Sequence, residues 1–266
     1  MEIKVNNTFF TGKFLLHLPS VDSTNTYAKS LIAKSSPIDG TVILADEQFA
    51  GRGQSGNVWQ SEAGKNLTFS IIYQTSFLLA TEQFYLNMAV SLGIWSMVNS
   101  QLSIEKNKEL TTHDSRFTTK IKWPNDIYVN NQKIAGILIE NTISGMHLKH
   151  SVIGVGLNVN QEQFPYGINA TSLKEELLVQ SDLSVVLNDL LGAIEKYFLL
   201  LKERKFERLK TEYIESLYRY NEVSAFAKNG ISFDGKIIGV DALGNLQIET
   251  ENEILPFGFK EISFVI

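Results

Sequence analysis

Residues 120–140 read KIKWPNDIYVNNQKIAGILIE, two apolar stretches joined by a polar turn. Asn130 and Asn131 suit a two-residue hairpin turn, because asparagine tolerates the positive backbone angles that such turns need. The turn pairs Tyr128 with Lys133. The stretch therefore predicts a β-hairpin, and it carries the sequence WPND at 123–126, where a sheet would favour apolar residues.

The register of this hairpin brings two charged side chains together. It pairs Asp126 with Ala135, so Asp126 and Lys133 are predicted to be diagonal neighbours on one face of the sheet. They form either a surface ion pair, which is common and weak, or part of a site for an anion or a metal ion. Pro124 marks a strand edge or end, where polar groups can face a cleft. Gly136 interrupts an apolar run, which predicts a bulge or a ligand close to the backbone.

The rest of the chain alternates strand and helix patterns. The polar segment 103–120 is expected to be a solvated loop or hairpin extension without chemistry. A helical pattern follows 23–25, where a helix cap alone would explain the polar residues. Further strands and amphipathic helices are expected from residue type and apolar spacing: strands at 41–48, 66–75, 120–129, 133–141 and 147–158, and helices at 81–102 and, as a pair, within 182–220.

Composition narrows the class of protein. The chain has 266 residues, enough for one large domain with or without a small one, and its net charge of -5 provides no general attraction for nucleic acid. It has no cysteine, and its four histidines lack a metal-binding spacing. No signal peptide is recognisable, and no run approaches the ~18 apolar residues of a membrane helix. A soluble cytoplasmic protein that binds neither nucleic acid nor membrane is expected.

Composition changes after Asn221. The segment that follows consists of short strand patterns separated by Asn-Gly, Asp-Gly and Leu-Gly-Asn turns. This pattern indicates a small antiparallel barrel. Two domains are therefore predicted, at 1–221 and 222–266.

Glycines collect in the loop 47–66, EQFAGRGQSGNVWQSEAGKN, which also carries Arg52. Such a loop exposes backbone N–H groups that can surround an anion, although it lacks the spacing of a P-loop and is also compatible with a flexible turn. A second pair, Gly154 and Gly156, lies in the strand pattern VIGVGLNVN. Either a bound ligand or a tight strand crossing would explain that pair.

Taken in order, four segments resemble the biotin–protein ligase family. They are STN at 23–25, GRGQSGNVW at 51–59, KWPNDIYVNNQKIAGILIE at 122–140 and GVGLNVN at 154–160, and the KWPND…K..GIL.E element is the most specific. The resemblance extends from about residue 15 to the C-terminus. It implies an α+β fold, a mixed β-sheet with helices on one side, like class II synthetases, followed by an SH3-like barrel.

The resemblance also implies a reaction. Biotin and ATP form biotinyl-5′-AMP, with Mg²⁺ as cofactor, and the biotinyl group passes to a lysine of the carrier domain of a biotin-dependent carboxylase, such as acetyl-CoA carboxylase. Family members occur as monomers and homodimers. A lipoate or octanoate ligase shares the fold, but its RR..GGG.V.HD-like stretch is missing here. A silent biotin-binding module would need neither Arg52 nor Lys133.

Site residues carry over by matching position. The loop 164–173 resembles a second mobile loop that covers the adenylate. Lys133, Arg52 and Asp126 would be catalytic, with Mg²⁺ near Asp126. The remaining matches fall into a biotin set and an adenylate set: Ser23, Thr24, Asn25, Gln48, Gly51, Gly136 and Gly154 beside Arg52 and Lys133 for biotin, and Gly53, Gln54, Trp59, Asn125, Asn158 and Ala170 beside Asp126 for ATP and adenylate.

The chain departs from the family pattern in two ways. Gln54 and Val58 stand where many members have basic residues, which makes the glycine loop less cationic. The first matched segment also starts close to Met1, where members that act as repressors carry a helix-turn-helix domain. A ligase without a DNA-binding role is therefore expected.

Overall fold

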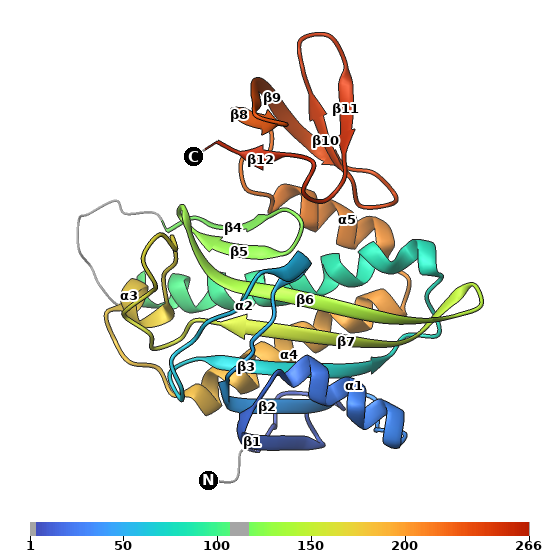
Figure 1. Ribbon diagram of the computed structural model, residues 1–266, viewed down its shortest axis with the longest axis vertical. Coiled ribbons are helices and arrows are strands. Elements are labelled where there is room, and N and C mark those ends of the chain that lie inside the picture. Colours follow the sequence, from blue (N-terminus) through green and yellow to red (C-terminus); the bar gives the residue numbers. More distant parts are fainter. Residues whose placement is uncertain (1–3, 107–116, 266) are drawn as a thin grey trace.

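The computed structural model describes residues 4–106 and 117–265. They form two β-sheets with helices packed on the larger one (Figure 1). The larger sheet has seven strands in the order β1-β2-β3-β7-β6-β5-β4, antiparallel except for the parallel pair β1 and β2. Its strands are β1 (Leu15–Val21), β2 (Thr41–Gln48), β3 (Leu67–Gln74), β4 (Thr119–Lys122), β5 (Asp126–Val129), β6 (Gln132–Ser144) and β7 (His147–Leu157).

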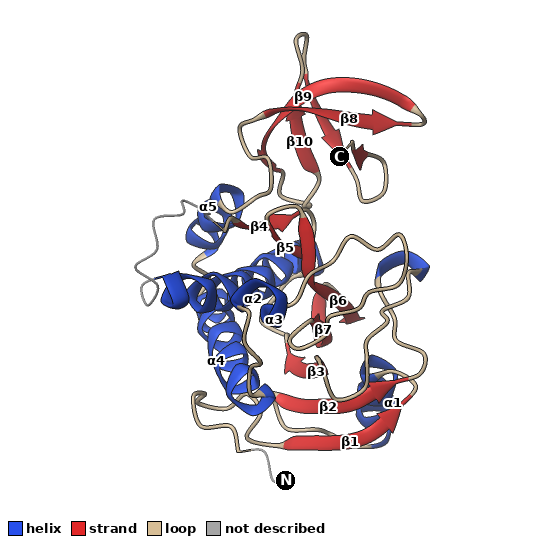
Figure 2. Ribbon diagram, turned by 90° about the vertical axis from the view of Figure 1, so that its left-hand side faces the viewer, coloured by secondary structure: helices blue, strands red, loops and turns tan. Residues whose placement is uncertain are grey.

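Helices lie on both faces of this sheet (Figure 2). The long helices α2 (Gln83–Lys106) and α4 (Leu183–Lys202) pack on one face and enclose the main core. Helix α1 (Thr24–Lys34) packs on the opposite face over a small apolar cluster that includes Ala28 and Ile72. The expected placement of helices on one side is therefore wrong for α1. The shorter helices are α3 (Leu173–Leu177) and α5 (Phe206–Glu215), with 3-10 turns at Gln54–Gly56 and Ala80–Glu82.

Local sequence explains the helix pair behind the sheet. Asp182 begins α4 by accepting hydrogen bonds from the backbone N–H groups of Ser184 and Val185 at 2.7 and 3.3 Å. Gly93 lets α2 approach α4 closely, because a Cβ there would meet the backbone of Ile194 at 2.7 Å. The two packed helices cover one face of the sheet, and the site lies on the other face, which carries α1.

The C-terminal segment forms a separate five-stranded antiparallel sheet in the order β11-β10-β9-β8-β12. This confirms the expected fold class, a mixed sheet with helices plus a small C-terminal β-structure. The sheet contacts the first domain at the end carrying β4 and α5 (Figure 1). The boundary after residue 221 stays a prediction. The strands are β8 (Val223–Lys228), β9 (Ile231–Val240), β10 (Leu246–Glu249), β11 (Ile254–Phe257) and β12 (Ser263–Phe264).

The predicted strand at 120–129 is two antiparallel strands, β4 and β5, joined by a turn with a cis Trp123–Pro124 peptide bond. The turn is held from behind: Asn87 on α2 and Tyr213 on α5 both donate to the carbonyl oxygen of Pro124, at 2.8 and 2.6 Å. The predicted position of Pro124 at a strand end is confirmed. The motif therefore lies at a turn that the two helices hold in place.

The hairpin register is partly as predicted. Tyr128 pairs with Lys133, but Asp126 lies opposite Gly136 instead of Ala135. A bulge in β6 causes this shift, because Ile134 is an extra residue between the paired positions.

The predicted helix at 81–102 also runs further than expected, to Lys106. The predicted solvated segment 103–120 is helical up to that residue and forms a strand from Thr119. Its residues 107–116 lie outside the described residues.

Candidate active site

A strip of glycines on β6 and β7 forms the floor of a cavity of about 270 Å³. Gly136 pairs with Gly156, and Gly154 pairs with Leu138, so the strip faces the side that carries α1. Two side chains occupy the space that a Cβ would fill: Trp59 lies against Gly156, and Asn25 lies against Gly154. Close approach of these side chains therefore explains Gly154 and Gly156. A bulge was one of the two alternatives at Gly136, and the bulge in β6 lies two residues earlier, at Ile134.

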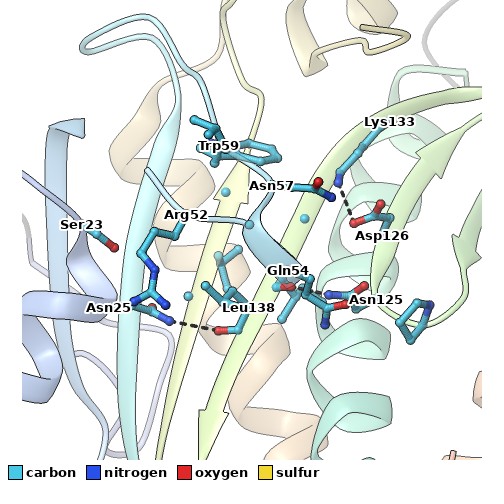
Figure 3. A pocket seen from close by; sticks show the side chains of 18 of the residues that line it. Ser23, Asn25, Arg52, Gln54, Asn57, Trp59, Asn125, Asp126, Lys133 and Leu138 are labelled. Atoms are coloured by element: carbon cyan, nitrogen blue, oxygen red, sulfur yellow. Dashed lines mark hydrogen bonds and ion pairs between the residues drawn. The ribbon is translucent and has the colours of Figure 1, made fainter. Parts of the chain in front are cut away.

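The glycine loop folds over this floor (Figure 3). Residues 51–59 form a narrow hairpin, in which Gly53 N–H donates to the Asn57 carbonyl at 2.7 Å and Trp59 N–H donates to the Gly51 carbonyl at 3.1 Å. Arg52 and Val58 face each other as an isolated antiparallel bridge. The hairpin holds the Trp59 indole on the glycine strip.

One side of the pocket carries a cluster of uncharged polar side chains, with Arg52 beside it. Thr24 donates to Gln48 Oε1 through its backbone N–H at 2.7 Å and its hydroxyl lies 3.0 Å from the same atom. Asn25 Oδ1 accepts from Ser70 Oγ at 2.7 Å. Ser23 occupies the N-cap position of α1, but its side chain makes no capping hydrogen bond. The polar residues at 23–25 line the pocket, and the Ser23 side chain does not cap the helix.

The opposite side carries charge (Figure 3). Lys133 Nζ lies 2.7 Å from Asp126 Oδ1 and 5.7 Å from the centre of the Trp59 ring. Burial lowers the pKa of Lys122, against the raising effect of the nearby Asp126 carboxylate. Asn125 is buried and donates to the carbonyl of Ile137. This side therefore presents the lysines Lys122 and Lys133 to an anion in the pocket.

Most residues of the predicted site line one pocket, and three do not. The residues that line it are Ser23, Thr24, Asn25, Gln48, Arg52, Gly53, Gln54, Trp59, Asn125, Asp126, Lys133, Gly136 and Gly154. Gly51 supports the hairpin, where a Cβ would overlap the carbonyl of Trp59. Asn158 donates to the Thr171 carbonyl at 3.0 Å, and Ala170 pairs with Lys133 as an isolated bridge, so both hold the 164–173 loop.

Several lining residues were missed by the sequence reasoning. Phe259 and Lys260 reach the pocket from the C-terminal sheet, in the loop between β11 and β12. Nothing in the local sequence signals this contact, because it depends on the docking of one sheet against the other. Trp123 does carry a signal: as the aromatic residue of WPND it lines the pocket and donates from Nε1 to the Gly244 carbonyl at 2.9 Å.

Comparison with known proteins accounts for this arrangement. A family model described as "Biotin/lipoate A/B protein ligase family" matches residues 17–158, the segment that supplies the glycine loop, the floor and Lys133. The chain belongs to this family. Within it, the chain is similar to the biotin–protein ligases, and the family predicted from the sequence is confirmed.

Three relatives illustrate the similarity of this ligase to others. The bifunctional ligase/repressor BirA of Bacillus spizizenii is 32% identical over 251 residues, covering 91% of this chain and 71% of the relative. A biotin–[acetyl-CoA-carboxylase] ligase of Mycobacterium tuberculosis is 29% identical over 173 residues, covering 65% and 59%. The solved biotin protein ligase of Aquifex aeolicus, in complex with biotin and ATP, has a TM-score of 0.70 at 29% identity and covers 94% and 98% of the two chains.

Two features are absent from the described residues of the ligase. None of their helices combines the length and the apolar character that crossing a membrane requires. No group of three or more His, Cys, Asp or Glu side chains in residues 4–106 and 117–265 is arranged to hold a metal ion.

Proposed function

We propose that this ligase activates biotin with ATP to biotinyl-5′-AMP and transfers the biotinyl group to a lysine of a carboxylase carrier domain. One observation carries the proposal. The pocket has the Lys133–Asp126 pair on one side and the uncharged cluster of Thr24, Asn25 and Gln48 on the other. Biotin has the same polarity, with a neutral ureido ring at one end and a carboxylate at the other.

In the first step, a carboxylate oxygen of biotin attacks the α-phosphorus of ATP. A new P–O bond forms, the bond to the bridging oxygen breaks, and pyrophosphate leaves. The attacking carboxylate is already ionised, so the barrier is the approach of two anions and not a proton transfer. Lys133 has the charge and the position to stabilise both groups where they meet. Lys122 and Lys260 line the same pocket and add positive charge near the phosphates.

The side with the uncharged polar cluster would hold the ureido ring. Ser23, Thr24, Asn25 and Gln48 offer hydroxyl and amide groups there, beside the backbones of Gly136 and Gly154. The adenylate would extend towards Trp59, whose indole provides a flat apolar surface, and towards Gly53, Gln54 and Asn125. Asn158 and Ala170 would act indirectly, through the loop that ends beside Lys133.

Mg²⁺ would bind this site only together with ATP. Asp126 is the carboxylate that lines the pocket within the described ranges, and it is paired with Lys133. Mg²⁺ in nucleotide sites is commonly held by one or two carboxylates together with phosphate oxygens and water. Asp126 would then orient Lys133 and supply one oxygen to the hydrated ion. The ion itself would neutralise phosphate charge.

In the second step, the amine of the carrier lysine attacks the carbonyl carbon of biotinyl-5′-AMP. An amide bond forms, the bond to the phosphate oxygen breaks, and AMP leaves while the amine loses a proton to solvent. The mixed anhydride reacts with water, so it must stay covered until the carrier arrives. The glycine loop over the floor is suited to that task.

A carrier-labelling assay tests this function. A purified carrier domain is incubated with the ligase, ATP and Mg²⁺, and with either biotin or lipoate, and its mass is measured. The proposal expects the mass of one biotinyl group and no lipoyl group. A lipoyl or octanoyl product would favour the other branch of the family. Biotin binding without any product would indicate a non-catalytic module.

A further inference from the structure

Glu140 ends the most specific sequence element, GILIE, and joins three parts of the site. It lies on β6, on the same face as Gly136 and Leu138. Its Oε1 accepts from Lys29 Nζ on α1 at 2.8 Å and from Arg52 Nη2 on the glycine loop at 3.2 Å. Its Oε2 accepts from Asn25 Nδ2 at 2.9 Å. One carboxylate therefore connects the pocket wall, the loop and the sheet.

The contact with Asn25 determines how its amide is oriented. A carboxylate can only accept hydrogen bonds, so the NH₂ group of Asn25 must face Glu140 and the carbonyl of Leu138. Asn25 Oδ1 then faces Ser70 and the space above Gly154. Glu140 thus determines that Asn25 presents its Oδ1 acceptor to the pocket.

The contact with Arg52 ties down the glycine loop. Within the hairpin 51–59, the bonds run mostly between its own two limbs. The Arg52 side chain instead crosses to β6, and Figure 3 shows it beside Asn25 and Leu138, away from Lys133. It therefore holds the loop that keeps Trp59 on the floor.

Glu140 remains ionised in this environment. Burial would raise the pKa of its carboxyl group, but the hydrogen bonds from Lys29 and Asn25 and the charges of Lys29 and Arg52 outweigh burial and lower it. The side chain is 23% exposed, against 45% for Arg52, so the pair is screened by solvent mainly on the arginine side.

We propose that Glu140 is a positioning residue, which latches the glycine loop through Arg52 and, through the same carboxylate, orients Asn25 for biotin. The consequence for adenylate retention rests on the proposed function, whereas the latch itself is a property of the ligand-free chain. Arg52 thus acts on the loop from outside the charged side of the pocket. Lys29 weakens the latch, because it shares Oε1 with Arg52 and its charge repels the guanidinium.

Trypsin tests the latch without any substrate. The protease cleaves after Arg52 only when it can take up the guanidinium, which Glu140 holds. Glu140→Gln should raise the initial rate of cleavage at the Arg52–Gly53 bond by about two- to fivefold, and Lys29→Met should lower it. Added salt should raise the rate for the original chain relative to Glu140→Gln. The control is Glu249→Gln, which removes a strand glutamate paired with Lys236 at 2.7 Å in the C-terminal sheet.

Two variants of Glu140 separate its two tasks. Glutamine can still accept from Asn25, so Glu140→Gln should increase escape of biotinyl-5′-AMP several-fold with a smaller change in the KM for biotin. Glu140→Ala removes both contacts, so it should raise that KM as well. Free adenylate is measured in the filtrate after a single turnover with pyrophosphatase present.

The outcomes distinguish the latch from the proposed function. Cleavage at Arg52 that is equal in Glu140→Gln and Glu249→Gln, or that changes in the same direction in Glu140→Gln and Lys29→Met, overturns the latch even if adenylate is formed. If the cleavage pattern is as expected but the original chain forms no adenylate, the latch stands and the proposed function fails.

Discussion

Gly156→Ala probes the contact between the floor and the glycine loop. Gly156 lies on β7, opposite Gly136, and a Cβ there would overlap the Cε2, Cζ2 and Nε1 atoms of Trp59. The added methyl group must displace either the strand or the indole. β7 is hydrogen-bonded on both sides, to β3 and to β6, whereas the loop is held by its own hairpin and by Arg52. The indole should therefore move.

The size of the effect follows from that difference. Forcing an extra methyl into a packed site costs about 1–3 kcal/mol. If the loop moves, this free energy weakens ligand binding and does not lower the stability of the fold. The dissociation constants of biotin and of the adenylate should then rise about 5- to 150-fold. The free energy of unfolding should change by less than about 1 kcal/mol, because the core behind the sheet is untouched.

Binding is measured by equilibrium dialysis with labelled biotin, and unfolding by urea titration. The second variant is Trp59→Ala, which removes the indole that the methyl group meets. In the Trp59→Ala background, Gly156→Ala should have little further effect on affinity. Full affinity in Gly156→Ala, or a loss that adds in full to that of Trp59→Ala, would refute the reasoning.

Three further changes test other parts of the site. Lys133→Ala should reduce adenylate formation about 10²- to 10³-fold, since it removes the cation where two anions meet, while unfolding changes by at most about 1 kcal/mol; normal pyrophosphate release would exclude the role. Lys260→Ala should raise the KM for ATP more than that for biotin, because the residue reaches the pocket from the C-terminal sheet; equal increases would contradict a nucleotide contact. Glu195→Gln should lower the free energy of unfolding by about 1–3 kcal/mol at neutral pH, because the buried carboxylate accepts from the N–H groups of Phe9, Phe10 and Thr11. Burial alone would raise the pKa of Glu195, but these bonds lower it, so the stabilisation is complete above the ordinary glutamate pKa and is lost as the pH falls through the lowered value; urea titrations that differ equally at all pH values would exclude this origin.

The charged pair of the site was predictable because its determinants are local. A two-residue turn and the alternation of strand faces place Lys133 near Asp126, and the structure has them 2.7 Å apart. The exact partner of Asp126 was not predictable, since Gly136 suggested a bulge or a ligand but nothing in the apolar run placed a bulge at Ile134.

The other features depend on contacts between distant segments. Phe259 and Lys260 enter the pocket because the C-terminal sheet docks at Trp123, and no local pattern encodes that docking. Glu140 is an intermediate case. Strand alternation puts it on the face of Gly136, but its partners Lys29 and Arg52 come from segments that only the fold brings together.

Two backbone hydrogen bonds join the 164–173 loop to Lys133, which limits how this loop could cover a nucleotide. Lys133 N–H donates to the Asn169 carbonyl at 3.1 Å, and Thr171 N–H donates to the Lys133 carbonyl at 3.0 Å. Residues 169–171 thus cannot move away from the pocket without breaking both of these hydrogen bonds to Lys133. A covering movement of the predicted loop would therefore involve residues 164–168, which precede these two bonds. Because residues 169–171 are bonded to Lys133 on both sides, such a movement would be coupled to the position of the lysine backbone.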